Sequence, residues 1–159
     1  MNNELDFIEK VKLFNEIGGT KNEFNARKAG LYVGLILEEV SELIQSLGYS
    51  GDRTDPNFSE AIEFLEVGSL NFKRGDYDNA VSECNRVEFL DAIVDISVVA
   101  LGAGIAIGAD VNSACHAVAN NNLEKFEIVD GKHTVLVDEN GKIRKPNNFK
   151  PVVLKEFVK

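Results

Sequence analysis

Hydrophobic positions that recur every three or four residues predict helices along most of the chain. The first such pattern covers residues 4–17 and stops at two glycines. A second covers residues 27–47 and stops at Gly48, and a shorter helix is expected over residues 58–72. A glycine directly after a periodic segment is typical of a helix end, so these boundaries support the helical interpretation.

The same spacing continues in the second half of the chain. It predicts a long helix from about Asp78 to Ile107, then another helix capped by Asp110 and reaching Phe126. Residues 96–109 contain no charge, but 14 residues fall short of the roughly 20 that span a bilayer. We interpret this stretch as the buried part of a core helix.

Beyond Phe126 the pattern changes. Turn signals at Asp130-Gly131 and Asn140-Gly141 surround the loosely alternating stretch KHTVLVDE, which indicates a short hairpin. Residues 127–159 as a whole, with two prolines near the end, are expected to form this hairpin and an extended arm. The predicted fold is therefore all-α, a helical bundle with a small C-terminal hairpin and extended arm, in one domain covering residues 1–159.

Composition and charge narrow the function classes. The 159 residues are 44% hydrophobic and 27% charged, which is typical of one soluble domain with a real core. The net charge of -9 argues against general attraction to nucleic acid or to anionic membranes. Residues 141–159 carry a net +5, which leaves -14 on residues 1–140. The two cysteines show no metal-ligand spacing or disulfide framework, and the N-terminus has no apolar signal core, so we expect a cytoplasmic protein.

Two groups of carboxylates lie at helical spacing on two of the predicted helices: Glu38, Glu39 and Glu42, then Glu88, Asp91 and Asp95. The second group interrupts a helix that is otherwise apolar and therefore expected to be buried, where an unpaired charge costs several kcal/mol. Residues 31–51 contain no lysine or arginine to pair with the first group. A hard cation, Mg²⁺ or Mn²⁺, would suit an all-carboxylate ligand set.

Four segments together resemble a known family: EEVSEL, EFLDAIVDISVVALGAGIAIGADV, VANNNLEKF and GKIRKPNNFKP. They are similar to the MazG-like, all-α nucleoside triphosphate pyrophosphohydrolases, and most similar to their phage-type, phosphoribosyl-ATP pyrophosphohydrolase-like branch. The similarity covers about residues 11–151. The 45 residues between Glu42 and Glu88 exceed the connection usual in that family, so residues 49–77 look like an insertion.

The resemblance implies roles for particular residues. The expected Mg²⁺ ligands are Glu39, Glu42, Glu88 and Asp91. Asp95 resembles an additional acid of this branch, and either Glu38 or Asp95 is a candidate to orient or deprotonate the attacking water. The residues expected to bind substrate are Asn122, Lys125, Lys142 and Lys145, although Asn120 and Asn121 match the family asparagine equally well.

The reaction that the resemblance implies is hydrolysis of a nucleoside triphosphate to the monophosphate and pyrophosphate. The motifs do not separate a general (d)NTP substrate from dUTP, dCTP or phosphoribosyl-ATP. Two other classes stay open, a noncatalytic metal-stabilised helical oligomer and a protein-interaction module. We expect a homodimer or homotetramer that assembles through the apolar faces of residues 93–107, with no nucleic acid or membrane as partner.

Overall fold

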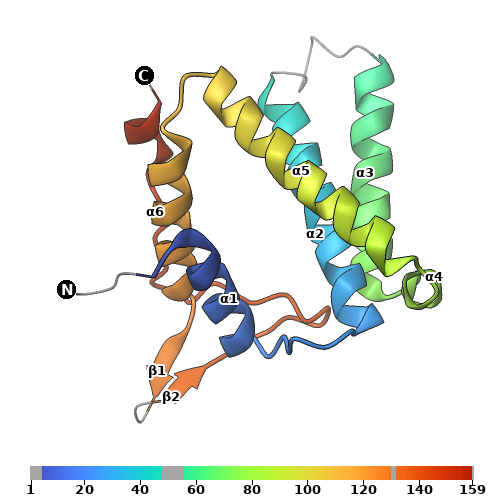
Figure 1. The fold of residues 1–159 in the computed structure, drawn as a ribbon, viewed down its shortest axis with the longest axis horizontal. Helices are drawn as coiled ribbons and strands as arrows, with labels where there is room; N and C mark the ends of the chain where they lie inside the picture. The colour runs from blue at the N-terminus through green and yellow to red at the C-terminus, as the bar shows by residue number, and fades with distance from the viewer. Residues whose placement is uncertain (1–4, 48–55, 130–131, 159) are drawn as a thin grey trace. The chain divides into compact units, whose positions relative to one another are not determined.

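The computed structural model describes residues 5–47, 56–129 and 132–158. Within them the chain forms an all-α fold with one two-stranded sheet, as the sequence predicted (Figure 1). The helices are α1 (Phe7–Ile17), α2 (Ala26–Ser46), α3 (Pro56–Arg74), α4 (Asp78–Ser82), α5 (Arg86–Ala106) and α6 (Val111–Leu123). The strands are β1 (Glu127–Val129) and β2 (Lys132–Thr134), and a 3₁₀ helix η1 covers Leu154–Phe157.

The chain divides into two compact units, each of which we describe by itself. Unit 1 contains Met1–Asn22, Asn85–Asp138 and Ile143–Lys159. Unit 2 contains Glu23–Cys84 together with the short C-terminal segment Glu139–Lys142. Unit 2 is therefore completed by four residues that come from the far end of the sequence.

Unit 2 is built on α2 and α3, which pack side by side along their lengths (Figure 1). Gln45 near the end of α2 bonds to Glu66, whereas Glu38 bonds to Lys73 further along α3, so the two helices run antiparallel. At Gly34 the helices approach very closely, because a Cβ atom there would lie 2.8 Å from the Ser69 carbonyl oxygen. This position therefore has no room for a side chain unless the helices move apart.

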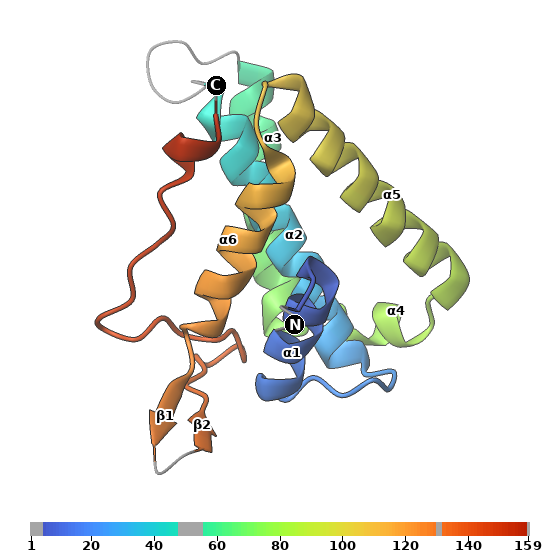
Figure 2. The ribbon, with the colours of Figure 1, turned by 60° about the vertical axis from the view of Figure 1, so that its left-hand side comes forward.

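Unit 1 has its core between α1 and α6. The β1–β2 hairpin follows α6 in the chain (Figure 2). The rings of Phe14 and the buried Phe126 lie 5.1 Å apart, and His133 of this hairpin packs on Phe126. The buried residue of α1 is Lys10, whose Nζ lies 3.4 Å from His116 Nδ1 on α6. The apolar spacing of the sequence favours Ile8 and Val11 as the buried residues of this helix, but both are exposed.

The C-terminal arm follows the hairpin as expected. Val137 pairs with Ile143 in an isolated antiparallel bridge, and the chain then runs without regular structure as far as η1. The end of the arm lies against the α5–α6 connection, where the Asp110 amide donates to the Phe157 carbonyl at 2.8 Å. The arm is thus attached to unit 1 at its end.

The expected helix over residues 78–107 is wrong in one respect, because it is two helices. The chain leaves helical geometry between Ser82 and Arg86, and the Asn85 side chain accepts a hydrogen bond from the Val87 amide at 3.1 Å. An asparagine that caps in this way starts a new helix. The following helix begins at the predicted cap Asp110, which accepts from the Ser113 amide at 3.1 Å, but it ends at Leu123 rather than at Phe126.

Helix α5 differs most from its expectation. We predicted a buried helix, yet none of its residues is buried in this chain. Within unit 1 it meets α6 where Gly104 leaves room for Val111, since a Cβ atom on Gly104 would lie 2.8 Å from a methyl of that side chain. By length and composition α5 could also cross a membrane. The expected insertion, residues 49–77, forms α3 and the following turn from Pro56 onward, and its first part lies outside the described residues.

Candidate functional site

The carboxylate of Glu38 is the most extensively paired acid on α2. Its Oε1 lies 3.1 Å from Nζ of Lys73 on α3, and its Oε2 lies 2.7 Å from Nζ of Lys142. The sequence suggested that this acidic group lacks basic partners, and for Glu38 that expectation is wrong. The lysines are 35 and 104 residues away in the chain, so local sequence could not show them.

These contacts also fix the charge state of Glu38. Partial burial by itself would raise the pKa of the carboxyl, but the hydrogen bonds and charges of Lys142 and Lys73 outweigh it and hold the pKa below its usual value. Glu38 is therefore an ionised group that both lysines orient.

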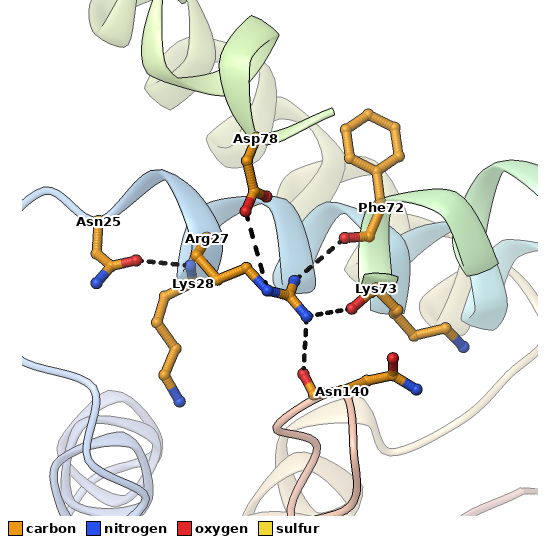
Figure 3. Close-up of polar contacts among 7 residues, drawn as sticks. All are labelled: Asn25, Arg27, Lys28, Phe72, Lys73, Asp78 and Asn140. Carbon is orange, nitrogen blue, oxygen red and sulfur yellow. Dashed lines mark hydrogen bonds and ion pairs between the residues drawn. The ribbon is translucent and has the colours of Figure 1, made fainter. Parts of the chain in front are cut away.

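Arg27, near the start of α2, holds together the segments that carry the two lysines (Figure 3). Its guanidinium donates to the carbonyls of Phe72 and Lys73 at the end of α3, and to the carbonyl of Asn140 at 3.1 Å. Its Nε also lies 3.9 Å from a carboxylate oxygen of Asp78 on α4. The donors of one arginine thus anchor the end of α3 and the turn before Lys142.

A pocket of about 380 Å³ opens between α2 and α3 beside Glu38. The lining side chains repeat at helical spacing, and all but Leu70 are polar: Glu38, Ser41, Glu42 and Gln45 from α2, and Glu66, Ser69, Leu70 and Lys73 from α3. Gln45 donates to Ser41 and Glu66, both at 3.0 Å. The expected ligand Glu42 therefore lies at the wall of a polar pocket in unit 2.

Glu39 and Glu42 are exposed and lie one turn apart on α2. Among the residues described in unit 2, neither carboxylate takes part in a hydrogen bond or ion pair. The neighbouring Glu38 has two lysine partners, so adjacent acids of one motif stand in different environments. Glu39 and Glu42 remain available as ligands.

The second motif has the same character on α5. Glu88, Asp91 and Asp95 are exposed, and the part of unit 1 that the structure describes gives none of them a hydrogen-bond or ion-pair partner. Across the described residues, no three His, Cys, Asp or Glu side chains are grouped as metal ligands. The two motifs belong to different units. As donors, four carboxylates in two i, i+3 pairs fit a hard divalent cation.

Two of the lysines expected to bind substrate come together in unit 1. Lys125 Nζ lies 5.7 Å from the centroid of the Phe149 ring, and Lys145 Nζ lies 5.8 Å from the same centroid. Lys125 also lies over Phe14. Lys142 is instead part of unit 2, where it contacts Glu38.

The three consecutive asparagines of α6 have different environments. The side-chain amide of Asn121 donates to the Lys150 carbonyl at 2.8 Å and to Glu124 at 3.0 Å, so it ties the arm to α6. Asn120 is exposed. The Asn122 side chain is half-buried, and its backbone carbonyl accepts from the Lys125 amide at 3.2 Å. The assignment of Asn122 to the substrate stays a prediction.

Sequence reasoning missed Lys73 and Arg27. The one available signal for Lys73 was its place on the stripe with Glu66, Ser69 and Leu70, which pattern alone does not tell from a solvated helix face. Arg27 gave no signal, because its acceptors are mostly backbone carbonyls.

Comparison of the chain with known protein families, with curated proteins and with solved structures finds no match.

Proposed function

We propose that the protein is a Mg²⁺-dependent nucleoside triphosphate pyrophosphohydrolase that converts a (d)NTP to the (d)NMP and pyrophosphate. The observation that carries the proposal is the pair of carboxylate motifs, Glu39 with Glu42 and Glu88 with Asp91. Each pair lies one turn apart on an exposed helix face, without a partner among the residues described in its own unit. The resemblance of these motifs to those of MazG-like enzymes supplies the reaction.

In this proposal Glu39, Glu42, Glu88 and Asp91 would hold Mg²⁺, for which Mn²⁺ could substitute. When bound, the ion supplies charge neutralisation of the triphosphate. A body with a net charge of -14 repels a bare triphosphate, so the ion is needed for binding as well as for chemistry.

The remaining residues act on water and on phosphate. Glu38 or Asp95 orients the attacking water and accepts its proton. Lys125, Lys142 and Lys145 contribute positive charge to the phosphate oxygens, and Asn122 contacts the substrate. Attack at the α-phosphorus breaks the bond between that phosphorus and the bridging oxygen, and pyrophosphate leaves with the bridging oxygen.

The experiment is an assay of pyrophosphate release over a panel of ribo- and deoxyribonucleoside triphosphates, with dUTP, dCTP and phosphoribosyl-ATP included. We expect release with Mg²⁺ and none with chelator present. Glu39→Gln should abolish release, and Glu60→Gln, which changes an exposed glutamate of α3 outside both motifs, should not.

The same panel separates the alternative of another class. If no nucleotide is hydrolysed while Mg²⁺ raises the thermal midpoint of the wild type but not of Glu39→Gln, the carboxylates belong to a noncatalytic, metal-stabilised oligomer. If Mg²⁺ leaves both thermal midpoints unchanged, the proposed metal site is wrong.

We further propose that the active form is a cytoplasmic homodimer or homotetramer. The support is the apolar surface of α5, where Val87, Val99 and Ile105 are each about two-thirds exposed or more. Apolar patches of this kind mark interaction surfaces.

A further inference from the structure

We infer that Lys73 is a positioning residue for Glu38, and that Lys142 is the exchangeable partner which moves from Glu38 to substrate phosphate. The inference rests on the proposed function for the role of Glu38 toward water. It assigns a part in that function to α3, the helix within the expected insertion.

The two lysines take different oxygens of the same carboxylate. Lys73 binds Oε1 at 3.1 Å and Lys142 binds Oε2 at 2.7 Å. Departure of Lys142 would therefore leave Oε2 open to a water molecule, while Oε1 stays bonded. Glu38 can change one partner without losing its orientation.

The two lysines also differ in burial, and the difference again favours Lys142 as the partner that leaves Glu38. The Lys73 side chain is 15% exposed, whereas that of Lys142 is 42% exposed. Lys142 makes the shorter of the two contacts, but water and salt screen an exposed charge pair more strongly than a covered one, so exposure decides which pair exchanges more readily. Lys142 is thus the partner that a phosphate group could recruit.

Three parts of Lys73 are held in place: its backbone carbonyl, its ammonium group and its aliphatic stem. Arg27 donates to its backbone carbonyl, its ammonium binds Glu38, and its stem crosses α2 at Gly34. A Cβ atom on Gly34 would lie 2.8 Å from Lys73 Cγ, so the missing side chain is what lets the stem pass. Gly34 precedes Glu38 by one helical turn, which brings the ammonium to the carboxylate.

Lys142 is held in a different way. It follows Gly141, whose φ of 82° is in the left-handed region, at the end of the segment that Arg27 binds through the Asn140 carbonyl. The backbone of this turn is therefore anchored while the side chain beyond it can reach either of two partners. Arg27 therefore anchors the backbone at Lys73 and the backbone just before Lys142.

The test compares Lys73→Met with Lys142→Met, since methionine keeps the stem and removes the charge. We expect Lys73→Met to lower kcat about 10- to 100-fold, the size of effect that a misplaced reacting group causes, with KM within about twofold of the wild type. Lys142→Met should mainly raise KM. Lys73→Arg should recover most of kcat, and Lys12→Met, in an exposed ion pair with Glu16 on α1, is the matched control without effect.

Two results would overturn the inference. One is a Lys73→Met variant that loses affinity and keeps kcat, because Lys73 would then be a phosphate contact. The other is additivity with Glu38→Gln, since a residue that acts through Glu38 has nothing left to position in the double variant. If Lys73→Met does not fold, Lys73→Gln replaces it with the same expectations.

A readout without nucleotide separates this inference from the proposed function. In urea unfolding, Lys73→Met and Glu38→Gln should be coupled, so that the double variant has a higher midpoint than the two single shifts predict. If the wild type hydrolyses nothing but the coupling is present, the proposed function fails and the Lys73–Glu38 pair stands. If the coupling is absent, the positioning role is wrong whatever the activity.

Discussion

At the scale of single residues, the lysines of the arm give the first prediction. Lys142→Ala and Lys145→Ala should each raise KM at low salt, and the difference from wild type should shrink at moderate salt, because salt screens exposed charge. Initial-rate kinetics at two ionic strengths measure this. Wild-type KM values in both variants would leave the arm a structural element that docks on the acidic body.

Cys115 on α6 gives a prediction that needs no substrate. Burial raises the pKa of its thiol, so less thiolate is present at pH 8 than in an exposed thiol. We expect Cys115 to react with iodoacetamide more slowly than glutathione does, and to accelerate as the pH rises toward the raised pKa. Mass spectrometry of the modified peptide against time measures the rate, and alkylation as fast as that of glutathione would contradict the expectation.

Individual residues also show which features of the site the sequence predicts and which it does not. The i, i+3 carboxylate pairs could be placed in advance, because helical spacing depends only on local sequence. The partners of Glu38 could not, since they are 35 and 104 residues away in the chain. Burial of Lys10 was equally hidden, because a lysine is buried only where a tertiary neighbour such as His116 accommodates it.

At the scale of helices, capping decides boundaries that periodicity leaves open. The apolar pattern continues from Asp78 to Ile107, so it predicted one helix, but Asn85 caps the Val87 amide and starts a second. Apolar side chains on both sides of Asn85 kept the pattern unbroken. Where a cap and the pattern agreed, as at Asp110, the predicted start was confirmed.

The cap of α6 gives a prediction at this scale. Asp110 accepts from the Ser113 amide at 3.1 Å and from the Ser113 hydroxyl at 2.8 Å. Asp110→Ala should lower the free energy of unfolding by about 1 kcal/mol, the usual contribution of such a cap. Urea unfolding measures it, with Asp76→Ala, an exposed aspartate outside any helix, as the control. Equal midpoints for Asp110→Ala and wild type would mean that the cap contributes nothing.

At the scale of the whole molecule, α5 is the feature that the single chain leaves unexplained. We expect light scattering at micromolar concentration to give a mass of two or four chains rather than the 17.5 kDa of one. Val94→Asp and Val98→Asp, both at exposed positions of α5, should shift the mass toward that of one chain. A monomeric wild type would sink this expectation.

A membrane is the other environment that could cover this helix, and its acids argue against one. Asp95 lies near the middle of α5, where an aspartate costs about 2.5–3.5 kcal/mol on insertion. We expect the protein to stay in solution when it is mixed with vesicles of neutral lipid and floated. Recovery with the vesicles would assign α5 to the bilayer.

The late segment that completes unit 2, residues 139–142, affects how the chain folds during synthesis. The ribosome delivers α2, α3 and α4 well before residue 140, and Arg27 is 113 positions away from its acceptor at Asn140. Until that segment emerges, Arg27 can bind only the end of α3 and Asp78, and Glu38 can bind only Lys73. Contacts between residues so far apart in the sequence form slowly during folding. The nascent α2–α3 pair must therefore persist in an incomplete form, and the emergence of residues 139–142 sets the time at which it is finished.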